Sequence, residues 1–240
     1  MKISKSKINT YKKCPREFKY IYVDKQHSEP NKFMKLGLDV HSVAENVGNI
    51  LKDMDDITYD DVVKAFEDGY IDSDFDISEH MSHLLDFFVD ALVEEQYKIV
   101  STEDSIEDNS IGVRGIVDLV LEDPETNELF VIDYKSSKTK PITDYRLELC
   151  IYKFLVEFKY PSRTVSSACI FFTKDGGYRG VNFTEEQSKG SFITQEDCDA
   201  VIKYIDFISD KIDKKIFPPK KQFLCQYCSF EDQCNKDGGF

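Results

Sequence analysis

Apolar residues along the first hundred positions recur at helical spacing. A short helix is expected to begin after Ser4 or Ser6, and a second at Pro15, because hydroxyl side chains cap helices and proline suits a first helical turn. The remaining helices of this stretch are expected over 35–51, 59–68 and 78–98.

Beyond residue 110 the apolar residues alternate, which is typical of strands. Strands over 113–121 and 129–136 flank the turn sequence DPETNE and therefore predict a hairpin. Helical spacing returns over 144–158, and the later elements are two strands and a long helix, at 166–173, 177–183 and 194–215. The order of elements predicts an α/β fold, a small mixed sheet flanked by helices.

The length of 240 residues suits one domain over 1–240. We divide it into basic N-terminal helices, an acidic helical insertion, a catalytic core and a cysteine-containing tail, at 1–22, 50–98, 99–192 and 223–235. No apolar run is long enough to cross a bilayer, and the first residues lack the apolar segment of a signal peptide. A cytoplasmic protein without a membrane partner is expected.

Charge is unevenly distributed along this chain, whose formal net charge is −14. Residues 1–19 are strongly basic, whereas residues 53–109 carry nineteen acids against two lysines. Nucleic acid responds to local potential, so the basic helices could bind phosphate despite the net charge. The acidic stretch is interpreted as a solvated face that could also dock a protein partner.

The predicted hairpin carries the main chemical signal. Asp118 lies on its first strand, and Asp133 and Lys135 project from one face of its second strand because they are two residues apart. Acids are rare in strands, and buried carboxylates are costly unless a cation compensates them. Oxygen ligands of this kind suit Mg²⁺ or Mn²⁺. The alternative is an Asp133–Lys135 ion pair at a sheet edge, with Asp118 in solvent.

The tail contains three closely spaced cysteines, Cys225, Cys228 and Cys234. A tetrahedral zinc site or a cubane cluster needs a fourth thiolate, and spacing alone fits either. Seven cysteines, an odd number, favour thiols or metal ligands over disulfides. Cys150, Cys169 and Cys198 lie within helix or strand patterns and are interpreted as core residues.

The order Asp118, turn, Asp133-x-Lys135, helix resembles the PD-(D/E)XK nuclease superfamily. The helix after the lysine in that family typically carries Gln-x-x-x-Tyr; here Glu148 and Tyr152 have this spacing, with glutamate in place of glutamine. Three further motifs resemble the RecB-like iron–sulfur branch, found in stand-alone CRISPR-associated and phage nucleases and in the AddB nuclease domain: Gly37-x-x-x-His41, Cys14-Pro15-Arg16 and the tail cysteines.

This resemblance implies a metal-dependent DNA exonuclease acting on single strands or ends. It implies Mn²⁺ or Mg²⁺ held by His41, Asp118, Asp133 and the Tyr134 carbonyl, with catalytic roles for Lys135, Glu148 and Tyr152. Glu103 is our choice for an additional acid, with Glu107 second. A [4Fe–4S] cluster, or alternatively zinc, would be held by Cys14, Cys225, Cys228 and Cys234.

The implied settings are recombination, repair, phage replication or CRISPR adaptation, with a helicase, recombinase or adaptation protein as a partner. Lys138, Lys140 and Arg146 could contact phosphates, while Tyr11, Tyr20 and Tyr22 offer either core packing or base stacking. A non-catalytic DNA-binding or assembly subunit is the alternative. A redox protein would explain the cysteines but not the hairpin carboxylates.

Overall fold

The computed structural model describes residues 1–26, 32–183 and 191–238. Its middle layer is a six-stranded mixed sheet with the strand order β1-β2-β3-β4-β5-β6. The strands are β1 (Lys98–Asp108), β2 (Val113–Glu122), β3 (Leu129–Lys135), β4 (Val165–Phe172), β5 (Gly177–Asn182) and β6 (Ser191–Phe192). β3 and β4 pair in parallel, as do β5 and β6, whereas the other neighbours are antiparallel. The predicted mixed sheet and hairpin are thus confirmed.

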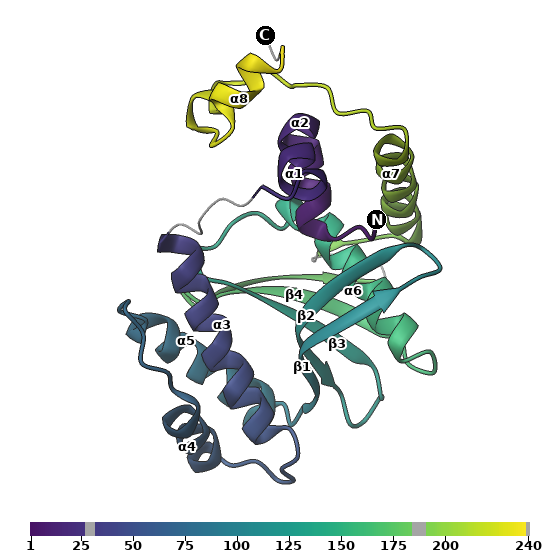
Figure 1. Cartoon of the computed structure of the whole chain (residues 1–240). Coiled ribbons are helices and arrows are strands. Elements are labelled where there is room, and N and C mark those ends of the chain that lie inside the picture. The colour runs from purple at the N-terminus through teal and green to yellow at the C-terminus, as the bar shows by residue number, and fades with distance from the viewer. Residues whose placement is uncertain (27–31, 184–190, 239–240) are drawn as a thin grey trace.

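Helices cover both faces of this sheet (Figure 1). One face carries α3 (Lys32–Leu51), α4 (Tyr59–Gly69) and α5 (Ser78–Val89). The other carries α6 (Arg146–Lys159), against which α1 (Lys5–Lys13), α2 (Pro15–Phe18) and α7 (Gln195–Asp213) pack. The short α8 (Glu231–Lys236) lies beside α2, so the C-terminal tail meets the N-terminal helices (Figure 1). Among the described helices, none is both long and apolar enough to span a bilayer.

Two hydrophobic cores result, one on each face of the sheet. The first joins α6 and α7 to the N-terminal helices through residues such as Ile8 and Phe18. The second joins α3, α4 and α5 to the sheet through residues such as Val62, Leu84 and Phe88. The acidic stretch 50–98 is therefore a covering layer whose apolar side packs on the sheet. Its acids lie mostly on the outer side.

Most predicted boundaries agree with the structure. The Ser4 hydroxyl caps α1, Pro15 begins α2, and the helices expected over 35–51, 144–158 and 194–215 are present with ends shifted by a few residues. Residues 184–190, part of the predicted core over 99–192, lie outside the described residues.

Two strands, β1 and the two-residue β6, were not anticipated. The helix expected over 78–98 ends in a single π-helical turn at Asp90–Glu94, and β1 begins at Lys98. Gln96 has a φ of +55°, a left-handed conformation that stops the helix. Within β1 the inward position Ser101 is polar, which hides the alternation expected of a strand.

Candidate active site

The site lies where β2 and β3 separate. Their antiparallel pairing ends at Leu119 and Ile132, and the next residues toward the opening are Asp118 and Asp133. The backbone N–H of Tyr134 donates to Asp118 Oδ2 at 2.7 Å. A carboxylate therefore satisfies a backbone donor at the point where the ladder between these strands ends. The hairpin places both aspartates in the interior, since Asp118 and Asp133 are 7% and 1% exposed.

Helix α3 brings His41 to this opening. About two turns further along α3, Gly48 lies so close to β1 that an added Cβ would be 2.4 Å from the Thr102 methyl group. Only glycine permits this approach, which holds α3 against the strand that bears Glu103. His41 Nδ1 is 3.1 Å from Glu103 Oε1 and 3.5 Å from Asp118 Oδ2, and its Nε2 is 3.1 Å from the Tyr134 carbonyl oxygen.

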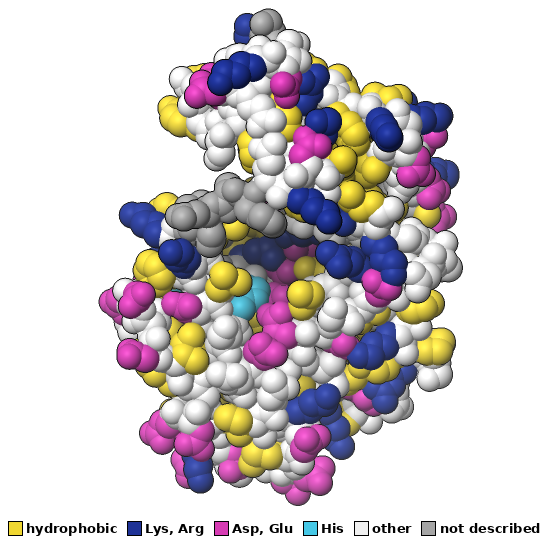
Figure 2. Space-filling model, in the orientation of Figure 1, with side chains coloured by type: hydrophobic (Ala, Val, Ile, Leu, Met, Phe, Trp, Pro, Cys, Tyr) yellow, Lys and Arg dark blue, Asp and Glu magenta, His cyan; other side chains and the backbone are white. Residues whose placement is uncertain are grey.

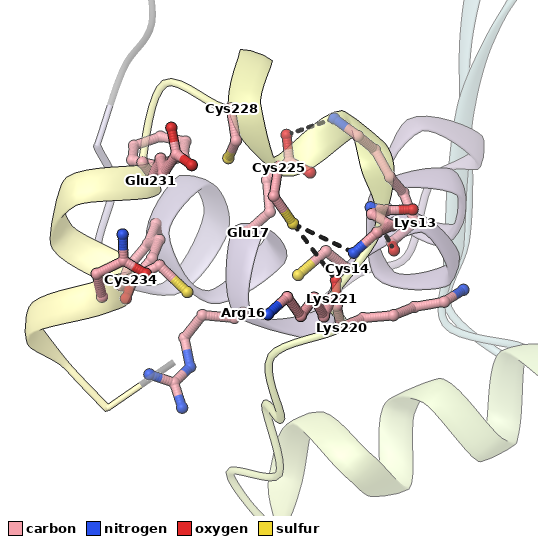
Figure 3. A pocket seen from close by; sticks show the side chains of 14 residues that line it. Lys13, Cys14, Arg16, Glu17, Lys220, Lys221, Cys225, Cys228, Glu231 and Cys234 are labelled. Carbon is pink, nitrogen blue, oxygen red and sulfur yellow. Dashed lines mark hydrogen bonds and ion pairs between the residues drawn. The ribbon is translucent and has the colours of Figure 1, made fainter. Parts of the chain in front are cut away.

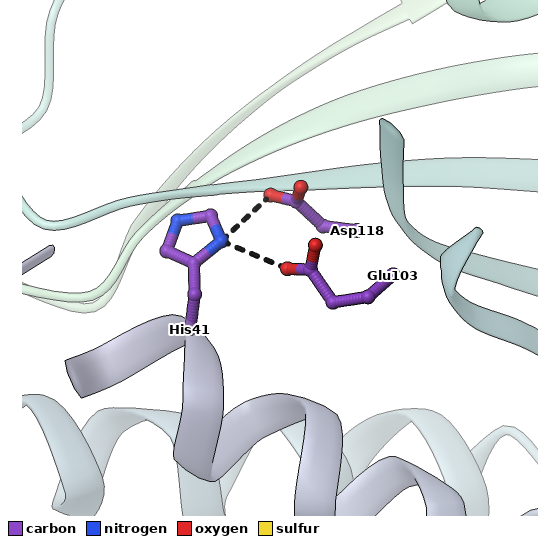
Figure 4. A group of neighbouring side chains, drawn as sticks. All are labelled: His41, Glu103 and Asp118. Atoms are coloured by element: carbon purple, nitrogen blue, oxygen red, sulfur yellow. Dashed lines mark hydrogen bonds and ion pairs between the residues drawn. The ribbon is translucent and has the colours of Figure 1, made fainter. Parts of the chain in front are cut away.

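The two candidate upstream acids are separated by the structure. Glu103 points toward His41 and Asp118 (Figure 4), whereas Glu107 forms an exposed ion pair with Lys2. Glu103 also has a φ of +42°, a strained conformation for a residue with a side chain. Such strain concentrates at functional sites, where the surrounding fold holds it in place.

A second cluster of polar groups surrounds Lys135 on β3 and the inner face of α6. Its ammonium pairs with Asp133 and lies 3.3 Å from Glu148 Oε1. The Tyr152 hydroxyl lies 3.1 Å from Asp133 Oδ1 and 3.2 Å from Glu148 Oε1. The predicted Asp133–Lys135 ion pair is present, but β3 is an interior strand and Asp118 is buried rather than in solvent.

Lys5, at the first position of α1, completes this cluster by pairing with Glu148. The sequence does not single out Lys5, because it is one of seven basic residues scattered over positions 1–19. Neither motif nor spacing distinguishes it from its neighbours. The contact depends on how α1 packs on α6, which only the tertiary structure reveals.

These groups line a cavity of about 560 Å³ that also includes Arg114 and Ile116 of β2. Figure 2 shows the histidine and acidic side chains at the floor of a hollow, with lysine and arginine side chains along its rim. Lys138 and Lys140 are not among the residues that line this cavity, and Arg146 pairs with Asp197 instead.

The cavity holds an excess of buried negative charge. Burial and the charge of Asp133 raise the pKa of Asp118 to about 7. Burial lowers the pKa of His41, but its hydrogen bond with Glu103 and the Asp118 charge outweigh burial and raise that pKa to about 8. Burial and the charge of Asp133 also raise the pKa of Glu148. The raised pKa values of Asp118 and Glu148 thus come first from burial, whereas that of His41 comes from the carboxylates beside it.

The donor set fits a divalent cation. His41, Glu103 and Asp118 each present a ligand atom, and these atoms all lie within 4.8 Å of one another (Figure 4). Carboxylate oxygens with one imidazole suit Mn²⁺ and Mg²⁺. The Tyr134 carbonyl oxygen lies next to this group because it contacts His41 Nε2. The Asp133 oxygens are engaged elsewhere: Oδ2 contacts Lys135, and Oδ1 contacts the Tyr152 hydroxyl.

The four cysteines line a second cavity, of about 210 Å³, between α8 and the junction of α1 and α2. Figure 3 shows the sulfurs of Cys14, Cys225, Cys228 and Cys234 pointing into a common space. Side chains from the N-terminal helices hold the tail in place: Arg16 Nε donates to the Phe217 carbonyl at 3.0 Å, and the Tyr20 hydroxyl bonds to Asp237 at 2.8 Å.

The spacing of these sulfurs bears on what could occupy the cavity. Zinc–sulfur bonds of about 2.3 Å in a tetrahedron place sulfurs about 3.8 Å apart. Among the described residues, no three of these cysteines have sulfurs within 4.8 Å of one another. A cubane cluster has an iron at each of four corners and therefore separates its thiolates more widely than a single ion does.

The other cysteines and the N-terminal tyrosines pack as core residues. Cys150 and Cys198 are buried with their sulfurs 3.2 Å apart, and Cys169 is half-buried in β4. Tyr11 and Tyr20 are buried, so the core-packing interpretation holds for both of them.

Comparison with known proteins agrees with this architecture. The model of the family described as the PD-(D/E)XK nuclease superfamily matches residues 2–235. The chain belongs to this superfamily. No curated protein matches it. Among solved structures, it is similar to the one titled "Crystal structure of SSO0001", with 14% identity over 91% of this chain and 93% of that chain, at a TM-score of 0.31.

Membership in the PD-(D/E)XK superfamily indicates a nuclease that uses a divalent metal and takes DNA as substrate. The hairpin of β2 and β3 carries Asp118 on its first strand and Asp133 and Lys135 on its second. These residues and the His41 group line one cavity.

Proposed function

We propose that this chain is a metal-dependent exonuclease that hydrolyses DNA phosphodiester bonds on single strands or at ends. The observation that carries the proposal is the convergence of His41, Glu103 and Asp118 beside the Asp133–Lys135 pair in one open cavity. Hydrolysis of a phosphodiester requires that negative charge in the transition state be offset and that a water be activated. Cationic groups placed beside carboxylates can do both.

A divalent cation at this site supplies Lewis acidity that offsets charge on the phosphate and eases deprotonation of water. His41, Glu103 and Asp118 would hold it, with Asp133 and the Tyr134 carbonyl adjoining. Asp118 also fixes the β3 backbone through the Tyr134 N–H. The same carboxylate thus links the metal site to the strand that carries the lysine.

Lys135 orients a water or stabilises charge on the phosphate. Burial lowers the pKa of Lys135, but Asp133 and Glu148 outweigh burial and hold that pKa above its ordinary value. The lysine is therefore an ammonium, suited to charge stabilisation and hydrogen-bond donation. Tyr152 lies between Asp133 and Glu148 and holds both carboxylates in place.

The test is digestion of end-labelled single-stranded DNA with Mn²⁺ or Mg²⁺, comparing the wild type with Asp133→Ala. We expect the wild type to release short products from linear strands and the variant to release none. Circular single-stranded DNA is the matched substrate without ends, and it should resist digestion. Equal behaviour of the two proteins would refute the catalytic assignment, and salt-sensitive DNA binding without turnover would favour a non-catalytic subunit.

We further propose that Cys14, Cys225, Cys228 and Cys234 hold a [4Fe–4S] cluster, as in the RecB-like branch. The convergence of the four cysteines on one cavity supports a shared bound group, and the resemblance to the RecB-like branch favours the cluster over zinc. Anaerobically purified protein should show the broad visible absorbance of an iron–sulfur cluster and contain iron. A colourless protein loaded with zinc would overturn this assignment.

A further inference from the structure

Glu148 is the most heavily contacted carboxylate of the cavity. It is 2% exposed, and its Oε1 accepts from Lys5, from Lys135 at 3.3 Å and from the Tyr152 hydroxyl at 3.2 Å. Within the described residues, its other oxygen is buried without a hydrogen-bond partner. One oxygen atom therefore joins β3, α6 and the first residue of α1.

The charges around the cavity can be counted. Four carboxylates line it, those of Glu103, Asp118, Asp133 and Glu148. Among the described residues, the cations that pair with these carboxylates are Lys5 and Lys135. Arg114 also lines the cavity, but in the described part of the chain it is exposed and forms no ion pair with them. Without Lys5, Glu148 would share the single ammonium of Lys135 with Asp133. Buried charge that is not compensated is costly and repels a phosphate.

The backbone of Lys5 is well placed for this role. The Ser4 hydroxyl caps α1, and Ile8 and Tyr11 on the same helix are buried in the core with α6. The side chain of Lys5 thus enters the cavity from a helix whose position is fixed. Arg114 also lines the cavity, but among the described residues it forms no ion pair with Glu148.

We infer that Lys5 is a positioning residue for the proposed reaction: paired with Glu148, it sets the charge balance of the cavity and places a second ammonium beside the phosphate site. This inference rests on the proposed function. The two charges act in opposite directions on a cation in this cavity, so removing one or the other shifts Mn²⁺ affinity in opposite directions and removing both leaves it near the wild-type value.

The test is a double-mutant cycle read by Mn²⁺ binding, using calorimetry on purified full-length protein. Lys5→Met adds net negative charge and should tighten Mn²⁺ binding on the order of tenfold, whereas Glu148→Gln should weaken it by a similar factor. The double variant should return to within about threefold of the wild type, because the two charges cancel. If the contact were merely structural, the two single variants would not be expected to shift Mn²⁺ affinity in opposite directions, nor the double variant to restore it.

A kinetic readout separates positioning from folding. Lys5→Met should raise the KM for a single-stranded oligonucleotide on the order of tenfold, because one cation near the phosphate is lost. Lys5→Arg should recover most of that loss, since it keeps the charge. If Lys5→Met is poorly folded, its melting temperature will show it, and the Lys5→Arg and double variants still report on the pairing.

Lys2→Met is the matched control, because Lys2 also pairs with a glutamate but at the exposed Glu107 position outside the cavity. Its Mn²⁺ affinity should equal that of the wild type. Single variants that shift Mn²⁺ affinity in the same direction, or a double variant as impaired as the worse single one, would overturn the inference while leaving the nuclease proposal standing. Absence of Mn²⁺ binding in the wild type would overturn both.

Discussion

The two cavities of this chain are built in opposite ways. The carboxylate cavity lies between a sheet and helices that bury two hydrophobic cores, and its charged groups already contact one another. The cysteine cavity lies between the chain ends. Its cysteines are half-buried, and α8 contains no buried residue. Hydrogen bonds such as that of Arg16 with the Phe217 carbonyl hold the tail, and the rings of Phe217 and Phe230 pack against Phe18 and Tyr20.

This difference indicates what each bound group is expected to do. The carboxylate cavity is shaped by the fold before a cation arrives, so the cation serves chemistry. The cysteine tail has too little core to be stable by itself, so its bound group contributes to folding. Variants in the first cavity should change activity without loss of structure, and variants in the second should do the reverse.

The largest expected effect comes from Asp118→Asn, which removes a charged ligand and keeps the side-chain shape. Cleavage should fall by about 10³ or more, since charge stabilisation of this kind is worth that much. An amide oxygen can still accept the Tyr134 N–H, so the fold should persist. Assays with end-labelled DNA and the absorbance of the cluster measure the two properties separately.

The same variant should stabilise the metal-free protein. Burial and Asp133 raise the pKa of Asp118 to about 7, so its ionisation costs folding free energy. That cost is absent at pH values below the ordinary pKa and is fully present above about pH 7. Asp118→Asn should therefore raise Tm by a few degrees at about pH 8, with little change at about pH 4. A lower Tm at both pH values would contradict this.

A smaller effect should distinguish the two upstream acids. Glu103→Gln should reduce cleavage by about 10² because this residue contacts His41 and adjoins Asp118, whereas Glu107→Gln should leave cleavage unchanged. Glu103 and Glu107 lie four positions apart on β1, so general damage to this strand would affect both variants. Equal losses in the two variants would show that Glu103 has no special role.

The contrast between the cavities also explains what the sequence could predict. The hairpin and its polar residues could be predicted because Asp118, Asp133 and Lys135 interrupt otherwise apolar strands. His41 and Glu103 were named only through the family resemblance, because a lone histidine on a helix and one acid among nineteen carry no local signal. Their convergence depends on packing, through contacts such as that of Gly48 with β1.

Lys5 and β1 were missed for related reasons. Lys5 is one lysine among many, and its partner Glu148 is distant by 143 residues. β1 lacks alternation because polar residues occupy inward positions next to the site. The polar groups needed for function thus obscure the apolar pattern that identifies a strand. By contrast, Cys14 was named through the family resemblance, and it lines the same cavity as the tail cysteines; its role as a ligand stays a prediction.

The smallest effect on cleavage is expected from Cys14→Ala, in the second cavity. Loss of one thiolate should abolish the cluster, and the tail from about residue 218 should become sensitive to protease, because α8 has no core of its own. The sheet and its two cores should stay folded. Activity should fall only severalfold, through loosened α1, which carries both Cys14 and Lys5 at its two ends. Cys169→Ala, outside the cavity, is the control and should keep the cluster. Unchanged metal content in Cys14→Ala would show that the chain ends are joined by hydrogen bonds alone.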